Sequence, residues 1–196
     1  MIYPIVAYGD PVLKARAKDI PADFPADELQ KLIADMYETM YYANGVGLAA
    51  PQIGKSVRLF VIDSAPMVDD DEDGDDAPAE VGVKRAFINP VILDETGEEW
   101  GFEEGCLSIP GIRERVFRKP DIVIRYEDEN RQLHEEGFSG MTARVIQHEY
   151  DHLEGVLFTD KISSFKKQII KNKLTRIAKG DAKADYRMRF AGQRGR

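Results

Sequence analysis

The sequence predicts an α+β domain, because β-rich segments occupy the middle of the chain and amphipathic helical segments lie near both ends. Its 196 residues, of which 43% are apolar, are enough for one domain with a buried core, or for one domain with a tail. No segment approaches the ~20 consecutive apolar residues that a membrane helix needs. We therefore expect a soluble single domain rather than a doubly wound parallel sheet.

The first helix is expected over residues 26–43. Its apolar residues recur on one face, and Asp27 and Gln30 have the spacing of a capping box. Asn44 and Gly45 should end the helix, because both residue types adopt the left-handed conformation more readily than others.

Four segments in the middle of the chain predict strands, because they are rich in β-branched and aromatic residues. They are residues 57–63, 85–93, 112–118 and 122–127. Residues 64–84 separate the first two strands and contain eight acidic residues between Asp69 and Glu80. Such a segment is too polar to pack, so we expect a solvated surface excursion there.

Two further helices are expected after the strands. Ser139 is a candidate N-cap for the second helix, which should run through Leu153 to Gly155. The third helix is expected over residues 163–178. Its apolar residues at helical spacing are Phe165, Ile169, Ile170, Leu174 and Ile177.

The net charge of −8 is distributed unevenly along the chain. Residues 161–196 contain twelve Lys and Arg against two acidic residues, whereas the first 160 residues are strongly acidic. The basic segment is either an exposed amphipathic helix with a solvated tail or a surface for a polyanionic partner.

The cysteine content and the N-terminus both favour a reducing compartment. Cys106 is the single cysteine, which excludes an internal disulfide bond. The first residues have neither the basic region nor the apolar run of a secretory signal. We therefore expect a cytoplasmic protein.

Two of the three histidines lie in the sequence His148-Glu149-Tyr150-Asp151-His152. On a helix, residues i and i+4 differ by about 40° around the axis, so both imidazoles can bind one metal ion. Glu149 points about 100° away from His148, which places it to take a proton from a metal-bound water. The alternative is a pair of histidines on a partly exposed helix, with Glu149 as a solvated charge.

A catalytic site of this type usually has a third protein ligand. Metzincins place a third histidine where this chain has Phe158, and no glutamate follows Glu154 as a thermolysin-like site would require. Cys106 is the better candidate, although a lone cysteine is normally a small buried apolar residue. Three downstream aspartates remain open as carboxylate ligands: Asp160, Asp181 and Asp185.

A third feature is the segment GVGLAAPQ at residues 45–52, which follows the first helix. Its small residues allow a ligand to approach the backbone closely, and Gln52 offers an amide donor. A helix end followed by a loop would explain the glycines equally well.

Together, three motifs in this order resemble those of peptide deformylases. They are G-x-G-L-A-A-x-Q at residues 45–52, E-G-C-L-S at 104–108 and Q-H-E-x-D-H-L at 147–153. The resemblance covers residues 1–165, which we expect to form the catalytic domain, with an acidic loop insertion at about 66–84. Residues 166–196 would form a basic C-terminal helix and tail. The implied fold has mixed and antiparallel sheets packed around a central metal-binding helix.

The resemblance implies that the protein hydrolyses the N-terminal formyl group from newly synthesised polypeptides and releases formate. Glu149 would be the general base and then the acid that protonates the leaving amine. The Gln52 amide and the Leu107 backbone N–H would stabilise the developing oxyanion. The implied metal ligands are Cys106, His148 and His152.

The resemblance also implies a site for an extended peptide, whose backbone would pair with Val46 and Gly105. The expected substrate-binding residues are Gly45, Val46, Gly47, Phe102, Gly105, Arg113, Met141 and Val145. Four of them would line the methionine slot: Val46, Phe102, Met141 and Val145. Arg113 could equally be an ordinary surface arginine. Arg144 lies nearby in sequence, and its aliphatic stem could contribute while its charge stays in water.

The implied cofactor is one divalent metal ion, with Fe²⁺ expected in the cell and Zn²⁺, Ni²⁺ or Co²⁺ as alternatives. The expected partners are N-formylmethionyl nascent peptides and, through the basic tail, the ribosome. We expect a monomer that binds neither membranes nor DNA. Two other functions stay open: a metalloprotease with an aspartate ligand, and a degenerate, non-enzymatic binding module on the ribosome.

Overall fold

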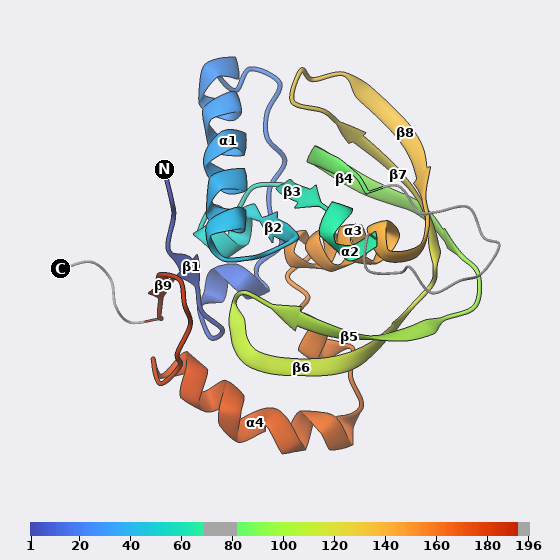
Figure 1. Cartoon of the computed structure of the whole chain (residues 1–196). Helices are drawn as coiled ribbons and strands as arrows, with labels where there is room; N and C mark the ends of the chain where they lie inside the picture. Colours follow the sequence, from blue (N-terminus) through green and yellow to red (C-terminus); the bar gives the residue numbers. More distant parts are fainter. Residues whose placement is uncertain (69–81, 192–196) are drawn as a thin grey trace.

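The fold is built on a five-stranded sheet in which all neighbouring strands are antiparallel, in the order β2-β3-β4-β7-β8 (Figure 1). The computed structural model describes residues 1–68 and 82–191. The strands of this sheet are β2 (Gly47–Ala49), β3 (Leu59–Asp63), β4 (Lys84–Thr96), β7 (Asp121–Glu127) and β8 (Leu133–Phe138). Two strand pairs lie outside it: β5 (Trp100–Cys106) is antiparallel to β6 (Ile109–Arg118), and β1 (Ile5–Val6) is parallel to β9 (Met188–Arg189).

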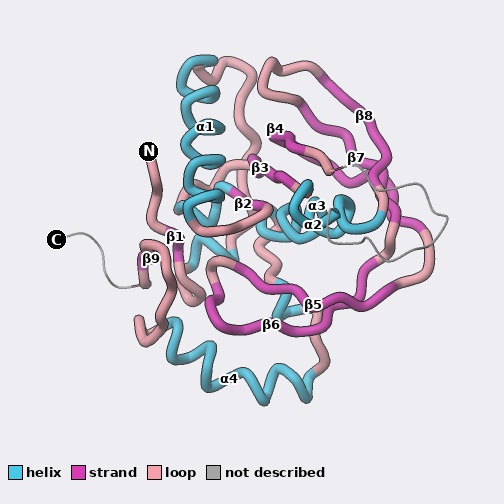
Figure 2. Tube along the Cα trace, in the orientation of Figure 1, coloured by secondary structure: helices cyan, strands magenta, loops and turns pink. Residues whose placement is uncertain are grey.

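The helices surround these strands, and α3 lies between the large sheet and the β5–β6 hairpin (Figure 2). They are α1 (Ala26–Tyr42), α2 (Ala65–Val68), α3 (Gly140–Leu153) and α4 (Ser164–Ala178), with 3-10 turns η1 (Pro11–Lys14), η2 (Ala50–Ile53) and η3 (Phe158–Asp160). This arrangement confirms the predicted α+β class. Within residues 1–68 and 82–191, no helix has the length and apolarity needed to cross a membrane.

Strand β3 is buried on both faces, because α1 covers one face and α3 the other. Leu59 and Val61 belong to the hydrophobic cluster that contains the apolar residues of α1, whereas Phe60 and Ile62 belong to the cluster of α3. Successive side chains of a strand point to opposite faces, so a strand covered on both sides is apolar at every position. This explains why residues 59–62 of the predicted strand are all apolar.

Helix α1 agrees with the prediction within one residue. Asn44 adopts a left-handed φ of 54°, and the Gly45 N–H donates to the Met40 carbonyl at 2.9 Å, which ends the helix. The predicted capping box is wrong, because the helix begins after Pro25 without a side-chain cap. Asp27 instead lies in the first turn, where the helix dipole favours a negative charge.

Helix α3 begins directly after Ser139, as predicted, but the Ser139 side chain makes no capping hydrogen bond. Helix α4 also has the predicted bounds within one residue, but its predicted apolar face is only partly buried. Ile170 and Ile177 are buried, whereas Phe165 and Ile169 are 76% and 61% exposed. The face that carries these two side chains has no covering element among the described residues.

Five of the described strands were not predicted from the sequence. Three of them, β1, β2 and β9, have only two or three residues, and the two longer ones, β5 and β8, are poor in strong strand formers. β5 contains two glycines and two glutamates, and β8 is an edge strand that pairs only with β7 in the described sheet. Their pairing with β6 and β7 supplies the stability that their own residues do not.

The prediction of a surface excursion over residues 64–84 is wrong at its first residues. Ser64 is fully buried, and its hydroxyl lies 2.8 Å from the Thr142 hydroxyl on α3. Residues 65–68 form the short helix α2. The acidic run from Asp69 to Glu80 lies wholly within residues 69–81, which are outside the described residues.

Candidate metal centre and cleft

Cys106, His148 and His152 bring three ligand atoms to within 4.8 Å of one another. Both histidines come from α3, and their ring centroids lie 5.3 Å apart, as the i, i+4 spacing predicts. Cys106 is the last residue of β5, and its Sγ lies 3.3 Å from Nε2 of His152. One thiolate and two imidazoles form a donor set that suits a first-row transition metal or Zn²⁺.

Glu149 lies beside these three residues and is 5% exposed. Its Oε2 has no hydrogen-bond partner within the described part of the chain, although buried polar atoms normally have one. Burial is the largest influence on this carboxyl group and raises its pKa to about 7. The carboxylate is therefore available to a water molecule or a substrate next to the ligand set.

Gly47 makes room for the Glu149 carboxylate. A Cβ atom at residue 47 would lie 2.4 Å from Oε1 of Glu149, far inside the normal contact distance. This close approach accounts for one of the glycines in the GVGLAAPQ segment, which the helix end at residues 44–45 does not explain.

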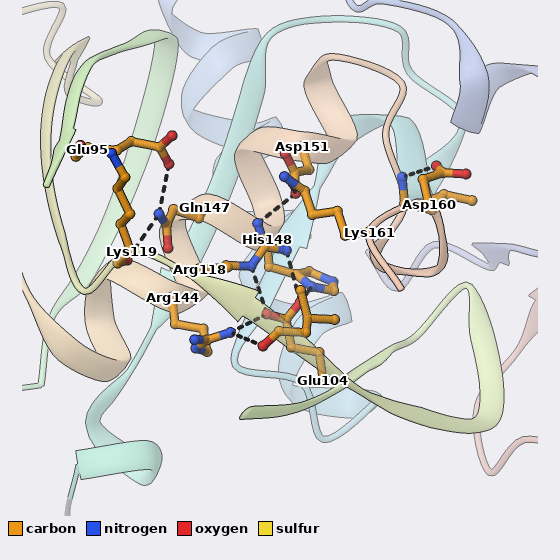
Figure 3. A network of polar contacts seen from close by, with 12 residues as sticks. Glu95, Glu104, Arg118, Lys119, Arg144, Gln147, His148, Asp151, Asp160 and Lys161 are labelled. Atoms are coloured by element: carbon orange, nitrogen blue, oxygen red, sulfur yellow. Dashed lines mark hydrogen bonds and ion pairs between the residues drawn. The ribbon is translucent and has the colours of Figure 1, made fainter. Parts of the chain in front are cut away.

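A buried carboxylate orients His148 (Figure 3). His148 Nδ1 lies 2.9 Å from Oε2 of Glu104, which leaves Nε2 as the ring nitrogen for a metal. Arg118 donates to both oxygens of Glu104, at 2.7 and 2.9 Å, and to Asp151 at 2.7 Å. Burial by itself would raise the pKa of Glu104, but the hydrogen bonds from Arg118 and His148 hold it well below its usual range.

The two histidines have opposite electrostatic environments. Burial lowers the pKa of His148, but contacts with Cys106 and Glu104 outweigh this effect and raise the pKa well above its usual value. Burial and the nearby His148 lower the pKa of His152.

Arg144 differs from the sequence prediction. We expected its charge to stay in water, but the residue is only 3% exposed. Its guanidinium donates to Glu104 at 2.8 Å and to the Trp100 carbonyl at 2.7 Å, and it lies 4.1 Å from the centroid of the Trp100 ring. The paired carboxylate and the aromatic face compensate for the loss of water.

Gln52 is held so that its amide NH₂ faces Cys106. The Ala49 N–H donates to Gln52 Oε1 at 2.8 Å, which fixes the orientation of the side chain. The Gln52 Nε2 then lies 3.4 Å from both Cys106 Sγ and Ser108 Oγ. Leu107 lies between Cys106 and Ser108 in the sequence, in the turn that follows β5.

These residues line a cavity of about 500 Å³. Its lining includes every residue predicted to bind substrate: Gly45, Val46, Gly47, Phe102, Gly105, Arg113, Met141 and Val145. It also includes all the residues predicted to act in catalysis and bind metal except His152, which lies behind them and is 1% exposed. Arg113 donates to the Glu103 carbonyl at 3.3 Å along the rim of the cavity.

Several lining residues were not predicted. Glu104 orients a ligand, and its place inside the E-G-C-L-S motif was the available signal. Lys183, Ala184, Asp185 and Tyr186 come from the C-terminal segment, and the sequence contains no signal that they return to the cavity.

Two of the alternative aspartate ligands, Asp160 and Asp181, lie away from the cavity in the described structure, whereas Asp185 lines the cavity without belonging to the ligand cluster. Oδ2 of Asp160 accepts the Leu157 N–H at 2.7 Å and forms an ion pair with Lys14. Asp181 pairs with Arg176. Among the described residues, the cluster that could hold a metal contains no aspartate.

Comparison with known proteins gives one consistent family. Residues 2–168 match the family model described as polypeptide deformylase. A peptide deformylase from Christiangramia forsetii is 60% identical over 191 residues, which cover 97% of this chain and 96% of that protein. The crystal structure of the Thermotoga maritima peptide deformylase is 42% identical, with a TM-score of 0.70, and covers 83% of this chain and 99% of its own. That of Arabidopsis thaliana peptide deformylase 1B is 36% identical, with a TM-score of 0.77, and covers 90% of this chain and 91% of its own.

Proposed function

The chain belongs to the polypeptide deformylase family, and we propose that Cys106, His148 and His152 form its metal centre. As a deformylase, it is a metal-dependent enzyme that removes the N-formyl group from newly synthesised polypeptides. The observation that carries the assignment of the site is the meeting of three ligand atoms beside a buried carboxylate whose Oε2 is unpartnered in the described structure.

The donor set fits a divalent ion, which when bound supplies Lewis acidity and lowers the pKa of a water molecule. We propose Fe²⁺ as the native ion, with Zn²⁺, Ni²⁺ and Co²⁺ as ions that the same ligands accept. Affinity alone favours the later metals of the series, so availability in the cell selects among them.

In the proposed reaction, Glu149 moves the proton. Its carboxylate takes a proton from the attacking water, whose oxygen becomes bonded to the formyl carbon. The formyl carbon–nitrogen bond then breaks, and the protonated Glu149 delivers the proton to the leaving amine. The products are formate and a free N-terminal methionine.

Gln52 and Leu107 would stabilise the charge that develops on the formyl oxygen. The Gln52 amide is fixed by the Ala49 N–H, and the Leu107 N–H lies in the turn next to Cys106. Donors that are held in place before the reaction can each contribute roughly 3–4 kcal/mol to transition-state stabilisation.

We propose that the peptide lies extended along the cavity, with its backbone next to Val46 and Gly105. The methionine side chain would occupy the apolar part of the cavity, whose lining residues are Val46, Phe102, Met141 and Val145. Arg113, on the rim, would contact the peptide backbone further downstream. We propose a monomer, because every proposed site residue comes from one chain. We propose that it acts in the cytoplasm, because its nascent substrates are made there.

The activity is tested by formate release from formyl-Met-Ala-Ser. Enzyme purified without oxygen and reloaded with Fe²⁺ or Ni²⁺ should release formate rapidly, and removal of the metal with a chelator should abolish the release. Anaerobic preparation protects the Cys106 thiolate from oxidation. No formate from a metal-replete enzyme would contradict the assignment.

We also propose that α4 contacts ribosomal RNA near the exit of nascent chains. The exposed side chains Phe165 and Ile169 share α4 with several exposed lysines, and the segment from residue 161 onward is strongly basic. Basic side chains bind the phosphates of RNA by releasing counterions, so this contact should weaken with salt.

The double variant Lys171→Glu/Lys173→Glu should reduce co-sedimentation with ribosomes, because both lysines are exposed on α4. The matched control is Lys55→Glu/Arg125→Glu, which makes the same charge change at exposed positions outside α4. Co-sedimentation that is equal in both variants, or that does not depend on salt, would refute the ribosome contact. Deleting residues 180–196 is a poorer test, because residues 183–186 also line the cavity.

A further inference from the structure

The residues beyond α4 form part of the cavity wall. Strand β9 pairs with β1, where the Ile5 N–H donates to the Arg187 carbonyl and the Ala7 N–H to the Arg189 carbonyl, both at 2.8 Å. This pairing brings the preceding residues Lys183–Tyr186 to the cavity, beside the turn between β5 and β6 (Figure 1).

Several contacts anchor this C-terminal segment. Met188 and Phe190 pack against the hydrophobic cluster that contains Val6 and the apolar residues of β6 and α4. The Arg189 guanidinium lies against Gly54, where a Cβ atom would come within 2.5 Å of it. The segment is therefore held by backbone pairing and by side-chain packing.

Tyr186 connects this segment to the turn that follows Cys106. Its hydroxyl donates a hydrogen bond to the Leu107 carbonyl at 2.8 Å, and its ring is partly buried against the cluster of α1. Burial raises the pKa of Tyr186 to about 12, so the hydroxyl stays a donor at neutral pH. On the other side of Leu107, the Tyr8 N–H donates to the Ser108 carbonyl at 2.9 Å.

We propose that Tyr186 is a positioning residue that aims the Leu107 N–H at the formyl oxygen. This inference rests on the proposed function, which makes that N–H an oxyanion donor. A hydrogen bond on the Leu107 carbonyl restricts rotation about the Leu107 backbone and so limits the directions that its N–H can take. Oxyanion donors contribute only when they are aimed correctly before the reaction, so a small displacement reduces kcat. The catalytic unit would then extend to about residue 190, beyond the domain boundary expected near residue 165.

The test is Tyr186→Phe, which removes the hydroxyl and keeps the ring that packs in the core. We expect kcat for formate release from formyl-Met-Ala-Ser to fall about tenfold, consistent with losing one hydrogen bond that aligns a donor. The KM and the metal content should stay unchanged, because the ring and the metal ligands are intact, and the Tm should fall by only about 2–4 °C, the effect of losing one hydrogen bond.

The matched control is Tyr8→Phe. Tyr8 is also a partly buried tyrosine beside this turn, and its hydroxyl forms no hydrogen bond within the described ranges. It should retain the kcat of the parent enzyme. A kcat of Tyr186→Phe equal to that of the parent, or a fall in kcat that is matched by an equal fall in bound metal, would overturn the positioning role. The activity of the parent enzyme tests the proposed function separately, because the positioning role depends only on the ratio between the variants and the parent.

Discussion

Replacing Glu149 with glutamine should reduce kcat for formate release by about 1000-fold while the enzyme retains its metal. The amide has nearly the shape of the carboxylate but cannot take a proton, and general acid–base catalysis contributes about 10²–10⁴-fold. The site supports this expectation, because the carboxylate is buried beside the ligand atoms and its Oε2 is unpartnered in the described structure. The measurement is steady-state formate release together with metal content.

Glu103→Gln is the matched control for this experiment. Glu103 also lines the cavity, but its side chain is exposed and has no assigned role. This variant should keep kcat within about twofold of the parent, since exposed charges away from the reaction have small effects. Comparable activity of Glu149→Gln and the parent would show that another group moves the proton.

Replacing Cys106 with alanine should abolish tight metal binding and, with it, formate release. Loss of a residue that only orients a ligand typically lowers metal affinity 10–100-fold, so loss of a ligand itself should cost at least about 100-fold. The remaining imidazoles would hold the ion without the negative charge of the thiolate. Metal content after dialysis, measured on folded protein, gives the result.

Asp160→Asn separates this assignment from the metalloprotease alternative. If Asp160 were a ligand in place of Cys106, this variant would lose metal, whereas Cys106→Ala would keep it. Here Asp160 accepts the Leu157 N–H and pairs with Lys14, so we expect Asp160→Asn to bind metal normally. Asparagine keeps an oxygen that can accept the Leu157 N–H and loses only the exposed ion pair with Lys14, so the free energy of unfolding should fall by less than about 1 kcal/mol. Metal loss in Asp160→Asn with metal retained in Cys106→Ala would refute the proposed ligand set.

The reliable sequence predictions depend on local geometry. Helix periodicity fixes the relation of His148 to His152 without knowledge of the rest of the chain, and the observed centroid distance of 5.3 Å agrees with it. The segments rich in β-branched and aromatic residues predicted β3, β4, β6 and β7, and the helix-ending residues Asn44 and Gly45 predicted the end of α1. The capping box at Asp27 was predicted wrongly, because it depends on a single side-chain hydrogen bond and several neighbouring residues could have begun the helix.

The polar network around Glu104 was beyond sequence reasoning. Glu104, Arg118 and Arg144 come from β5, β6 and α3, and only the packing of α3 on the β5–β6 hairpin brings them together. A buried arginine is costly unless a carboxylate lies within hydrogen-bond distance, so its burial depends on a partner distant in sequence. Because that partner, Glu104, could not be identified from the sequence, the charge of Arg144 was predicted to stay in water.

The sequence by itself determined the fold class, the helical pair of histidines and the family, because each depends on residues that are close together in the chain or on motifs read in order. The tertiary structure decided that Cys106 meets His152 across 46 residues, that Glu104 orients His148, and that Tyr186 reaches Leu107 from the C-terminal segment. These contacts join elements far apart in sequence, and their distances follow from the packing of all the intervening strands and helices. Local propensities do not encode that packing, because it is a property of the whole core.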